Sequence, residues 1–340
     1  MSARNYPDGS CVLHIGTHKT GTTTIQNFFA KEAETLREKG IQLDKYLSCS
    51  TGTLMRYAAN DSKLFRYRIE NKETDTASIN QYRAQFETRL ASLAAAGSTA
   101  VFIDEAAELL EQEEILRLIE LFNKYFKNIT VILYVRPQVD LATSLYTQHL
   151  RSGERFPEII PEKWYSRHHP RFDYLTKAKS WNGALTPHKG NFIIREFHRS
   201  KLFKSDAVRD FIKFLDINDD FPPFEEMNTS LSVEGQTLLR KMNKFFHENS
   251  IKDGARLRVK LLNLLEALPD IHDKGRLPSR EKAKAFMAHF HEDNLSLKQF
   301  LSNPTDDFLR VNYDRFPEKD TPEHMPPLPI ILRLLTEALR

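Results

Sequence analysis

The sequence predicts a three-layer α/β domain with a central parallel sheet and a helical C-terminal part. Over residues 11–200, short apolar stretches alternate with segments of helical period, which is typical of parallel βαβ units. Beyond residue 205 the pattern is almost wholly helical, and we find neither an internal repeat nor a flexible linker. We therefore expect a single domain over residues 1–340, with an α/β core at 11–200 and a mainly helical extension at 205–340.

The expected strands are short and apolar, as strands are when both faces of a parallel sheet are buried. They lie at residues 11–16, 41–43, 99–103, 130–135 and 191–195. Segments with helical spacing lie at 24–39, 79–95, 113–126, 205–215, 231–248, 255–267, 279–302 and 328–340. No clear period is present between residues 46 and 80, so irregular chain and short helices are expected there.

The composition is that of a chain able to bury a core. Of the 340 residues, 40% are hydrophobic and 28% are charged, which excludes collagen-like and wholly disordered classes. No stretch approaches the roughly 20 apolar residues that span a bilayer, and the first residues lack the apolar core of a signal peptide. We expect a cytoplasmic protein without an integral membrane segment. Cys11 and Cys49 are too few for a disulfide scaffold or a four-cysteine zinc site, so we expect reduced, packed thiols. We expect no metal site.

Positive charge is concentrated in one part of the chain. The net charge is +3, but residues 151–204 hold 12 Lys or Arg against 5 Asp or Glu. Such a segment is either solvated surface or a funnel for an anionic ligand. We expect that ligand to be a small molecule and not a nucleic acid.

A Gly/Thr-rich turn, Gly16-Thr17-His18-Lys19-Thr20-Gly21-Thr22-Thr23, stands between the first strand and the first helix. Backbone N–H groups and the helix dipole make an anion site at such a turn. The two glycines have the spacing of a Walker A loop, but Lys19 stands two residues before the second glycine instead of directly after it. The turn predicts a P-loop NTPase-like nucleotide site whose lysine reaches a different bridging oxygen.

A second motif covers residues 134–144. It places Arg136 at the carboxyl end of a parallel strand and Ser144 eight residues further on, in the following helix. Both side chains can then face one ligand at the C-terminal edge of the sheet. An arginine fork and a hydroxyl suit a phosphate group.

Together the two motifs resemble the sulfotransferases that use 3′-phosphoadenosine 5′-phosphosulfate (PAPS), in particular bacterial carbohydrate sulfotransferases with a His-Ile-Gly…Lys-Thr-Gly-Thr-Thr loop. The resemblance implies that the 5′-phosphosulfate is held by Lys19, Thr20, Gly21, Thr22 and Thr23, with Lys19 stabilising charge on the oxygen between phosphorus and sulfur. It implies that Arg136 and Ser144 bind the 3′-phosphate. It also implies that Lys274 and Gly275 belong to a loop that closes over the nucleotide. Residues 192–215 and 228–232 also look like family segments. Cytosolic relatives often place an adenine-stacking Trp where this chain has Thr24.

The resemblance implies transfer of a sulfuryl group from PAPS to a hydroxyl, with adenosine 3′,5′-bisphosphate as the product and a carbohydrate or glycolipid as the expected acceptor. The reaction needs a base for the acceptor proton. Glu105 follows the third strand at the same sheet edge and is our candidate, with Lys19 as the second catalytic residue. Four histidines remain alternative bases: His18, His149, His168 and His169.

Two other function classes remain open. Residues 100–105 also fit a Walker B strand whose Asp104 would hold Mg²⁺ in a P-loop kinase or ATPase. A non-catalytic nucleotide-binding protein would keep the loops without a working base. The apolar terminal helix at 328–340 is expected to pack on the core or on a second subunit, which leaves a homodimer open.

Overall fold

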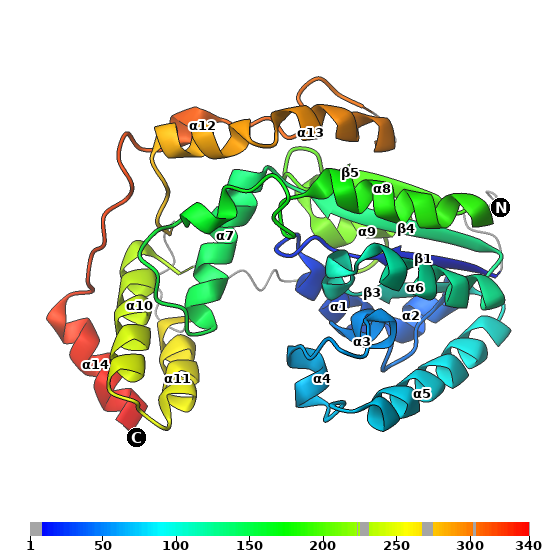
Figure 1. Ribbon diagram of the computed structural model, residues 1–340, viewed down its shortest axis with the longest axis horizontal. Helices are drawn as coiled ribbons and strands as arrows, with labels where there is room; N and C mark the ends of the chain where they lie inside the picture. The colour runs from blue at the N-terminus through cyan, green and yellow to red at the C-terminus, as the bar shows by residue number, and fades with distance from the viewer. Residues whose placement is uncertain (1–8, 223, 225–230, 267–274, 302–303, 340) are drawn as a thin grey trace. The chain divides into compact units, whose positions relative to one another are not determined.

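The computed structural model describes residues 9–222, 224, 231–266, 275–301 and 304–339 (Figure 1). These residues form two compact units. The first unit draws on the chain up to residue 136, on 170–225 and on 292–309. The second draws on 137–169, on 226–291 and on the chain from 310 onward.

A five-stranded sheet forms the centre of the first unit. Its strands are β1 (Ser10–His14), β2 (Ile41–Gln42), β3 (Thr99–Ile103), β4 (Asn128–Val135) and β5 (Asn191–Glu196). The order is β2-β3-β1-β4-β5 and every neighbouring pair is parallel. The α/β class with a central parallel sheet is thus confirmed. Because β1 stands between β3 and β4, the loops that follow these three strands meet at one edge.

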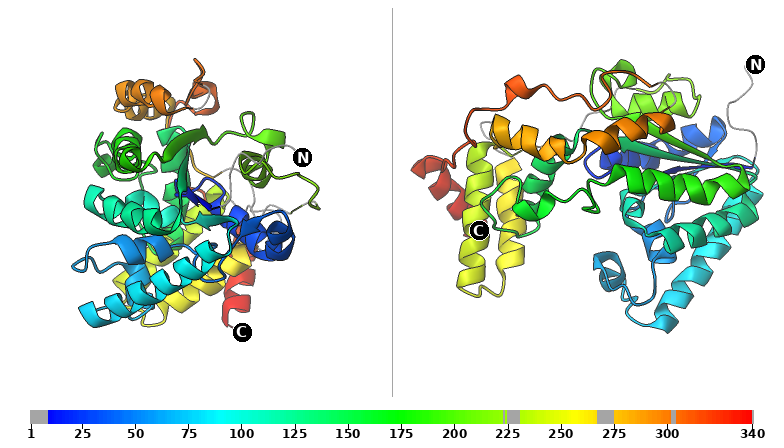
Figure 2. Two further views of the ribbon diagram at one scale, coloured as in Figure 1. Left: turned by 90° about the vertical axis from the view of Figure 1, so that its right-hand side faces the viewer. Right: turned by 45° about the horizontal axis from the view of Figure 1, so that its top comes forward.

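Helices cover both faces of this sheet, as Figures 1 and 2 show. On one face, α1 (Thr22–Lys31) and α9 (Ala207–Phe214) pack with β1 and β4 in a cluster of buried apolar side chains that includes Phe28, Phe211 and Ile132. On the other face lie α6 (Gln112–Tyr125) and α8 (Tyr174–Leu185). There the ring of Phe102 meets that of Phe122 with centroids 5.0 Å apart. The three layers follow from strands such as β1 and β3, in which every successive side chain is buried.

The other helices of the first unit flank these layers. They are α2 (Ala33–Glu38), α3 (Thr53–Ala58), α4 (Arg66–Glu70), α5 (Thr76–Ala95) and α13 (His291–Leu297), of which Glu292 onward belongs to this unit. The helix expected at 24–39 is divided at Glu32, where φ is −96° and ψ is 19°, outside the helical range. The helix expected at 279–302 is likewise divided, because α12 ends at Ala288.

The second unit is helical. Its helices are α7 (Gln138–Arg151), α10 (Val233–Glu248), α11 (Gly254–Glu266), α12 (Arg280–Ala288) and α14 (Leu328–Leu339). α10 packs against α7 and α11, and α11 packs against α14. Asn243 of α10 donates from its amide to the Leu150 carbonyl at 2.7 Å. α7 thus groups with the helices after residue 232, whereas α9 groups with the sheet.

Among the residues that the structure describes, no helix combines the length and the apolar character that crossing a bilayer requires.

Candidate functional site

The loop after β1 runs along the end of β4 before it enters α1. The Thr17 N–H donates to the Tyr134 carbonyl at 2.7 Å, and the Tyr134 N–H donates to the Gly16 carbonyl at 2.7 Å. Gly16 has a φ of +102°, and a Cβ on it would lie 3.3 Å from the Cα and from the carbonyl oxygen of Glu105. Glycine is therefore required where the loop passes over the backbone of Glu105.

The second half of the loop leads into the N-terminus of α1. The Thr20 hydroxyl donates to the Thr17 carbonyl at 2.6 Å, so it closes the turn from within. Lys19 is exposed with a φ of +65°, and Gly21, with a φ of +78°, precedes the helix. Among the described residues no side chain caps α1, and its first turn carries no acid. The first N–H groups of a helix lack intrahelical partners, and together with the helix dipole they favour an anion at this end.

Arg136 directly follows β4 and reaches the same loop. Its NH1 group donates to the Lys19 carbonyl at 3.1 Å, and its own carbonyl accepts from the Tyr174 hydroxyl at 3.0 Å. Its Nε is buried without a hydrogen-bond partner, as is the Thr22 hydroxyl at the start of α1. Burial lowers the pKa of Arg136, which still remains charged at neutral pH. The Arg136 cation and these two unpartnered polar atoms thus come from the start of α1 and from the residue that follows β4.

The other predicted nucleotide residues belong to the second unit. Ser144 is half-buried on α7, so its pairing with Arg136 stays a prediction. Lys274 and residues 228–230 lie outside the described residues. A Cβ on Gly275 would overlap the amide of Gln236, and the next residue, Arg276, donates its backbone N–H to Gln236 Oε1 at 2.9 Å. Gly275 therefore allows close packing against α10.

Glu105 begins the short 3-10 helix η1 (Glu105–Leu109), which is separated from β3 by Asp104 alone. Its side chain is 17% exposed, and its Oε1 lies 3.9 Å from the Nε2 of His18. Since Gly16 packs on its backbone, Glu105 stands against the loop that carries Lys19. The structure thus brings the candidate acid to the predicted anion site. Its role as a base stays a prediction.

Asp104, the alternative metal ligand, has a structural role. Its side chain is fully buried and accepts N–H groups from Gly52 at 2.6 Å, Leu54 at 2.8 Å and Ala106 at 3.0 Å. These bonds fix the start of α3 and cap η1. Burial raises the pKa of Asp104 to about 6, although the three amides oppose the shift. The described residues contain no group of three His, Cys, Asp or Glu that could hold a metal ion.

A buried charge cluster, which the sequence analysis did not predict, adjoins the loop. Its centre is Glu108, whose side chain is completely buried. Its Oε1 lies 2.5 Å from His18 Nδ1 and 3.1 Å from Arg171 NH1, while its Oε2 accepts from Lys177 Nζ at 2.7 Å. Burial alone would raise the pKa of Glu108, but the charge of Lys177, the hydrogen bond from His18 and then Arg171 hold this pKa well below its ordinary value. Glu108 is therefore an anion at neutral pH.

Two cations of the basic segment 151–204 belong to this cluster. Arg171 and Lys177 belong to the positive stretch 151–204, and both turn toward Glu108. Lys177 is 8% exposed, so its charge pairs with Glu108 inside the molecule and does not face solvent. The excess of positive charge in that stretch is the sequence feature related to this cluster, but it does not indicate a buried acid elsewhere in the chain. The remaining candidate bases, His149, His168 and His169, belong to the second unit.

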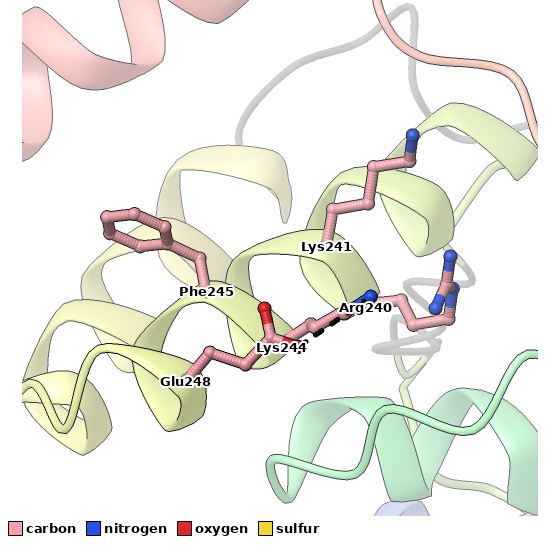
Figure 3. A pocket seen from close by; sticks show the side chains of 5 residues that line it. All are labelled: Arg240, Lys241, Lys244, Phe245 and Glu248. Atoms are coloured by element: carbon pink, nitrogen blue, oxygen red, sulfur yellow. Dashed lines mark ion pairs between the residues drawn. The ribbon is translucent and has the colours of Figure 1, made fainter.

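An open pocket in the second unit is lined by one face of α10 (Figure 3). Its lining residues are Arg240, Lys241, Lys244, Phe245 and Glu248. Arg240 pairs with Glu323 at 2.5 Å, and Lys244 pairs with Glu248 at 3.7 Å. Because these two cations already have acidic partners and the lining comes from a single helix, the pocket does not offer a built anion site.

No protein-family model, curated protein or solved structure matches this chain.

Proposed function

We propose that this protein is a PAPS-dependent sulfotransferase that moves a sulfuryl group to a hydroxyl, with a carbohydrate or glycolipid as the acceptor. The observation that supports it is the meeting of three features at one edge of the sheet. These are the uncapped start of α1 with Lys19 before it, the guanidinium of Arg136, and the carboxylate of Glu105. An anion site next to an acid suits transfer of a charged group to a hydroxyl.

The residues at the loop fit such a donor. The buried Thr22 hydroxyl and the Arg136 Nε both lack partners, which is costly unless a ligand supplies them. In the proposed complex, Lys19, Gly21, Thr22 and Thr23 hold the 5′-phosphosulfate with side chains or N–H groups. Thr20 contributes its N–H, because its hydroxyl is used within the loop. Arg136 and Ser144 are proposed to hold the 3′-phosphate, and Lys274 and Gly275 to belong to the closing loop.

The proposed chemistry divides two tasks between two residues. A bond forms between the acceptor oxygen and sulfur as the bond between sulfur and the bridging oxygen breaks, and its electron pair goes to the 5′-phosphate. Lys19 stabilises the negative charge that develops on this bridging oxygen. Glu105 takes the proton of the acceptor hydroxyl.

The alternative is a P-loop kinase or ATPase with Asp104 as a metal ligand. The geometry favours it less, because the carboxylate of Asp104 already accepts three backbone N–H groups. The position of Lys19 within the loop also differs from that of a Walker lysine.

The proposal that PAPS is the donor can be tested by comparing the affinities of different nucleotides. By calorimetry, adenosine 3′,5′-bisphosphate should bind the full chain more tightly than 5′-AMP or ATP. Arg136→Ala should remove most of this preference, since losing a charge-assisted contact to phosphate costs about 1.5–3 kcal/mol. Arg37→Ala, at an exposed position of α2, removes the same charge and should leave the preference intact. Equal affinity for ATP with a requirement for Mg²⁺ would favour the kinase.

A second experiment separates binding from chemistry. Lys19→Ala should lower kcat far more than it weakens binding of adenosine 3′,5′-bisphosphate, because the lysine charge matters most when the bridging oxygen becomes anionic. Lys189→Ala is a matched control, since Lys189 is also exposed and has a φ of +55°. A loss confined to nucleotide affinity would reduce Lys19 to a binding residue.

A further inference from the structure

We propose that Glu108 is a positioning residue that holds the His18 ring with its Nδ1–H toward the buried carboxylate and its Nε2 toward Glu105. In this arrangement His18 receives from Glu105 the proton that Glu105 takes from the acceptor. The identity of that proton rests on the proposed function; the orientation of the ring does not.

Burying the Glu108 carboxylate costs free energy. An unpaired carboxylate in a protein interior costs several kcal/mol, and even a paired one is seldom a gain over apolar packing. Yet Glu108 is completely buried and takes its partners from three parts of the fold: the β1–α1 loop, Arg171, and Lys177 of α8. It also accepts the backbone N–H of His18 at 3.3 Å. Together, these contacts of Glu108 fix the imidazole ring of His18 at the candidate site.

The neighbours of Nδ1 decide which ring nitrogen of His18 carries the proton. An ionised carboxylate only accepts hydrogen bonds and a guanidinium only donates them. Arg171 NH1 lies 2.5 Å from His18 Nδ1 and 3.1 Å from Glu108 Oε1, and Oε1 lies 2.5 Å from the same Nδ1. Nδ1 therefore has one neighbour that can only accept, Glu108 Oε1, and one that can only donate, Arg171 NH1. We assign the proton to Nδ1, so that His18 and Arg171 both donate to the carboxylate and the NH1–Nδ1 approach is not a hydrogen bond. Nε2 is then the ring nitrogen that faces Glu105, at 3.9 Å from its Oε1.

The charges around the His18 ring come from four side chains. Glu105 and Glu108 carry two negative charges, and Arg171 and Lys177 carry two positive ones. A neutral His18 leaves the group balanced, and an imidazolium formed at Nε2 lies between two carboxylates. In the proposed path the acceptor proton passes to Glu105, and once the Glu105 carboxylate moves from 3.9 Å to hydrogen-bond distance it passes to His18 Nε2, which returns Glu105 to its ionised form. Glu108 acts through His18 and does not touch the reacting atoms.

The test begins with the ring itself. Full-length protein is labelled with ¹⁵N-histidine, and the His18 ring signals are identified among the 12 histidines by their loss in His18→Gln. The wild-type spectrum should show a protonated Nδ1. A neutral ring protonated at Nε2 would overturn the inference.

Two variants then separate positioning from packing. Glu108→Leu with Lys177→Met removes one charge of each sign, which avoids an unpaired buried charge. Lys177→Met alone keeps Glu108 and measures what loss of the lysine does. The double variant should lose the preference for a protonated Nδ1 and show a kcat about tenfold or more below that of the single variant. Its affinity for adenosine 3′,5′-bisphosphate should stay within about twofold, since the proton path and the nucleotide site use different groups. Equal kcat in the two variants would overturn the inference.

The outcomes also separate this inference from the proposed function. If adenosine 3′,5′-bisphosphate does not bind but His18 is protonated at Nδ1, the sulfotransferase proposal fails and positioning by Glu108 is supported. If sulfuryl transfer occurs but His18 is protonated only at Nε2, the proposed function stands and the inference is overturned.

Discussion

Glu105 is the residue on which the proposed proton transfer depends. Glu105→Gln keeps the size of the side chain and removes its basicity. The variant should bind adenosine 3′,5′-bisphosphate like wild type and lose on the order of 10²–10⁴-fold in kcat. Glu120→Gln, at an exposed position of α6, should change neither quantity. Normal kcat in Glu105→Gln would move the base to His18, whose Nε2 is the nearby nitrogen at 3.9 Å.

At the same scale, the loop residues were predictable and Glu108 was not. Two glycines at fixed spacing between a strand and a helix are a local pattern, and Gly16 and Gly21 both have positive φ. Glu108 stands in an ordinary acidic-apolar stretch, and its side-chain partners lie 63 to 90 residues away in the sequence. A buried acid whose cations are so distant leaves no local pattern.

Elements were predicted best where burial dictates composition. The strands lie within two residues of their expected bounds, because a strand buried on both faces needs an unbroken apolar run. Breaks inside helical stretches were missed at Glu32 and after Ala288, because the apolar period continues through both. Periodicity reports which face is buried; it does not report where a helix ends.

Asp104 connects three elements, which makes its effect a matter of stability. Asp104→Ala leaves three buried N–H groups without their acceptor and should lower the free energy of unfolding by about 2–4 kcal/mol at pH 5. The pKa of Asp104 is about 6 in the folded chain against 3.8 for the free group, so the folded state binds the extra proton between these values. Stability from this group therefore falls as the pH rises from about 4 to about 6.

Urea unfolding of wild type and Asp104→Ala at pH 4.5, 5.5 and 7 measures this effect. The difference in free energy between the two proteins should narrow with rising pH. Added Mg²⁺ should not restore Asp104→Ala. A gap that widens with pH would contradict the raised pKa of Asp104, and rescue by Mg²⁺ would favour its role as a metal ligand.

At the scale of the whole molecule, the chain passes between its two units more than once. The sequence placed the end of the α/β core near residue 200, because the strands end there. The structure groups α9 with the sheet and α7 with the later helices. Sequence order alone does not show such an exchange, since the apolar face of α7 or of α9 does not indicate which unit the helix packs against.

The contribution of α9 can be tested by truncation. A fragment of residues 1–205 keeps all five strands but loses Val208, Phe211 and Ile212 from the core, each contributing about 1.5–3 kcal/mol by burial. It also loses Asp210, which accepts from the Tyr134 hydroxyl at 2.6 Å and from Arg195 at 2.7 Å. We expect no cooperative urea transition in this fragment, followed by the fluorescence of its tryptophans. A fragment of residues 1–225, which restores α9, should recover a transition. A cooperative transition of the 1–205 fragment with the midpoint of the full chain would show that the sheet is complete without α9 and that the boundary near residue 205 is a true domain edge.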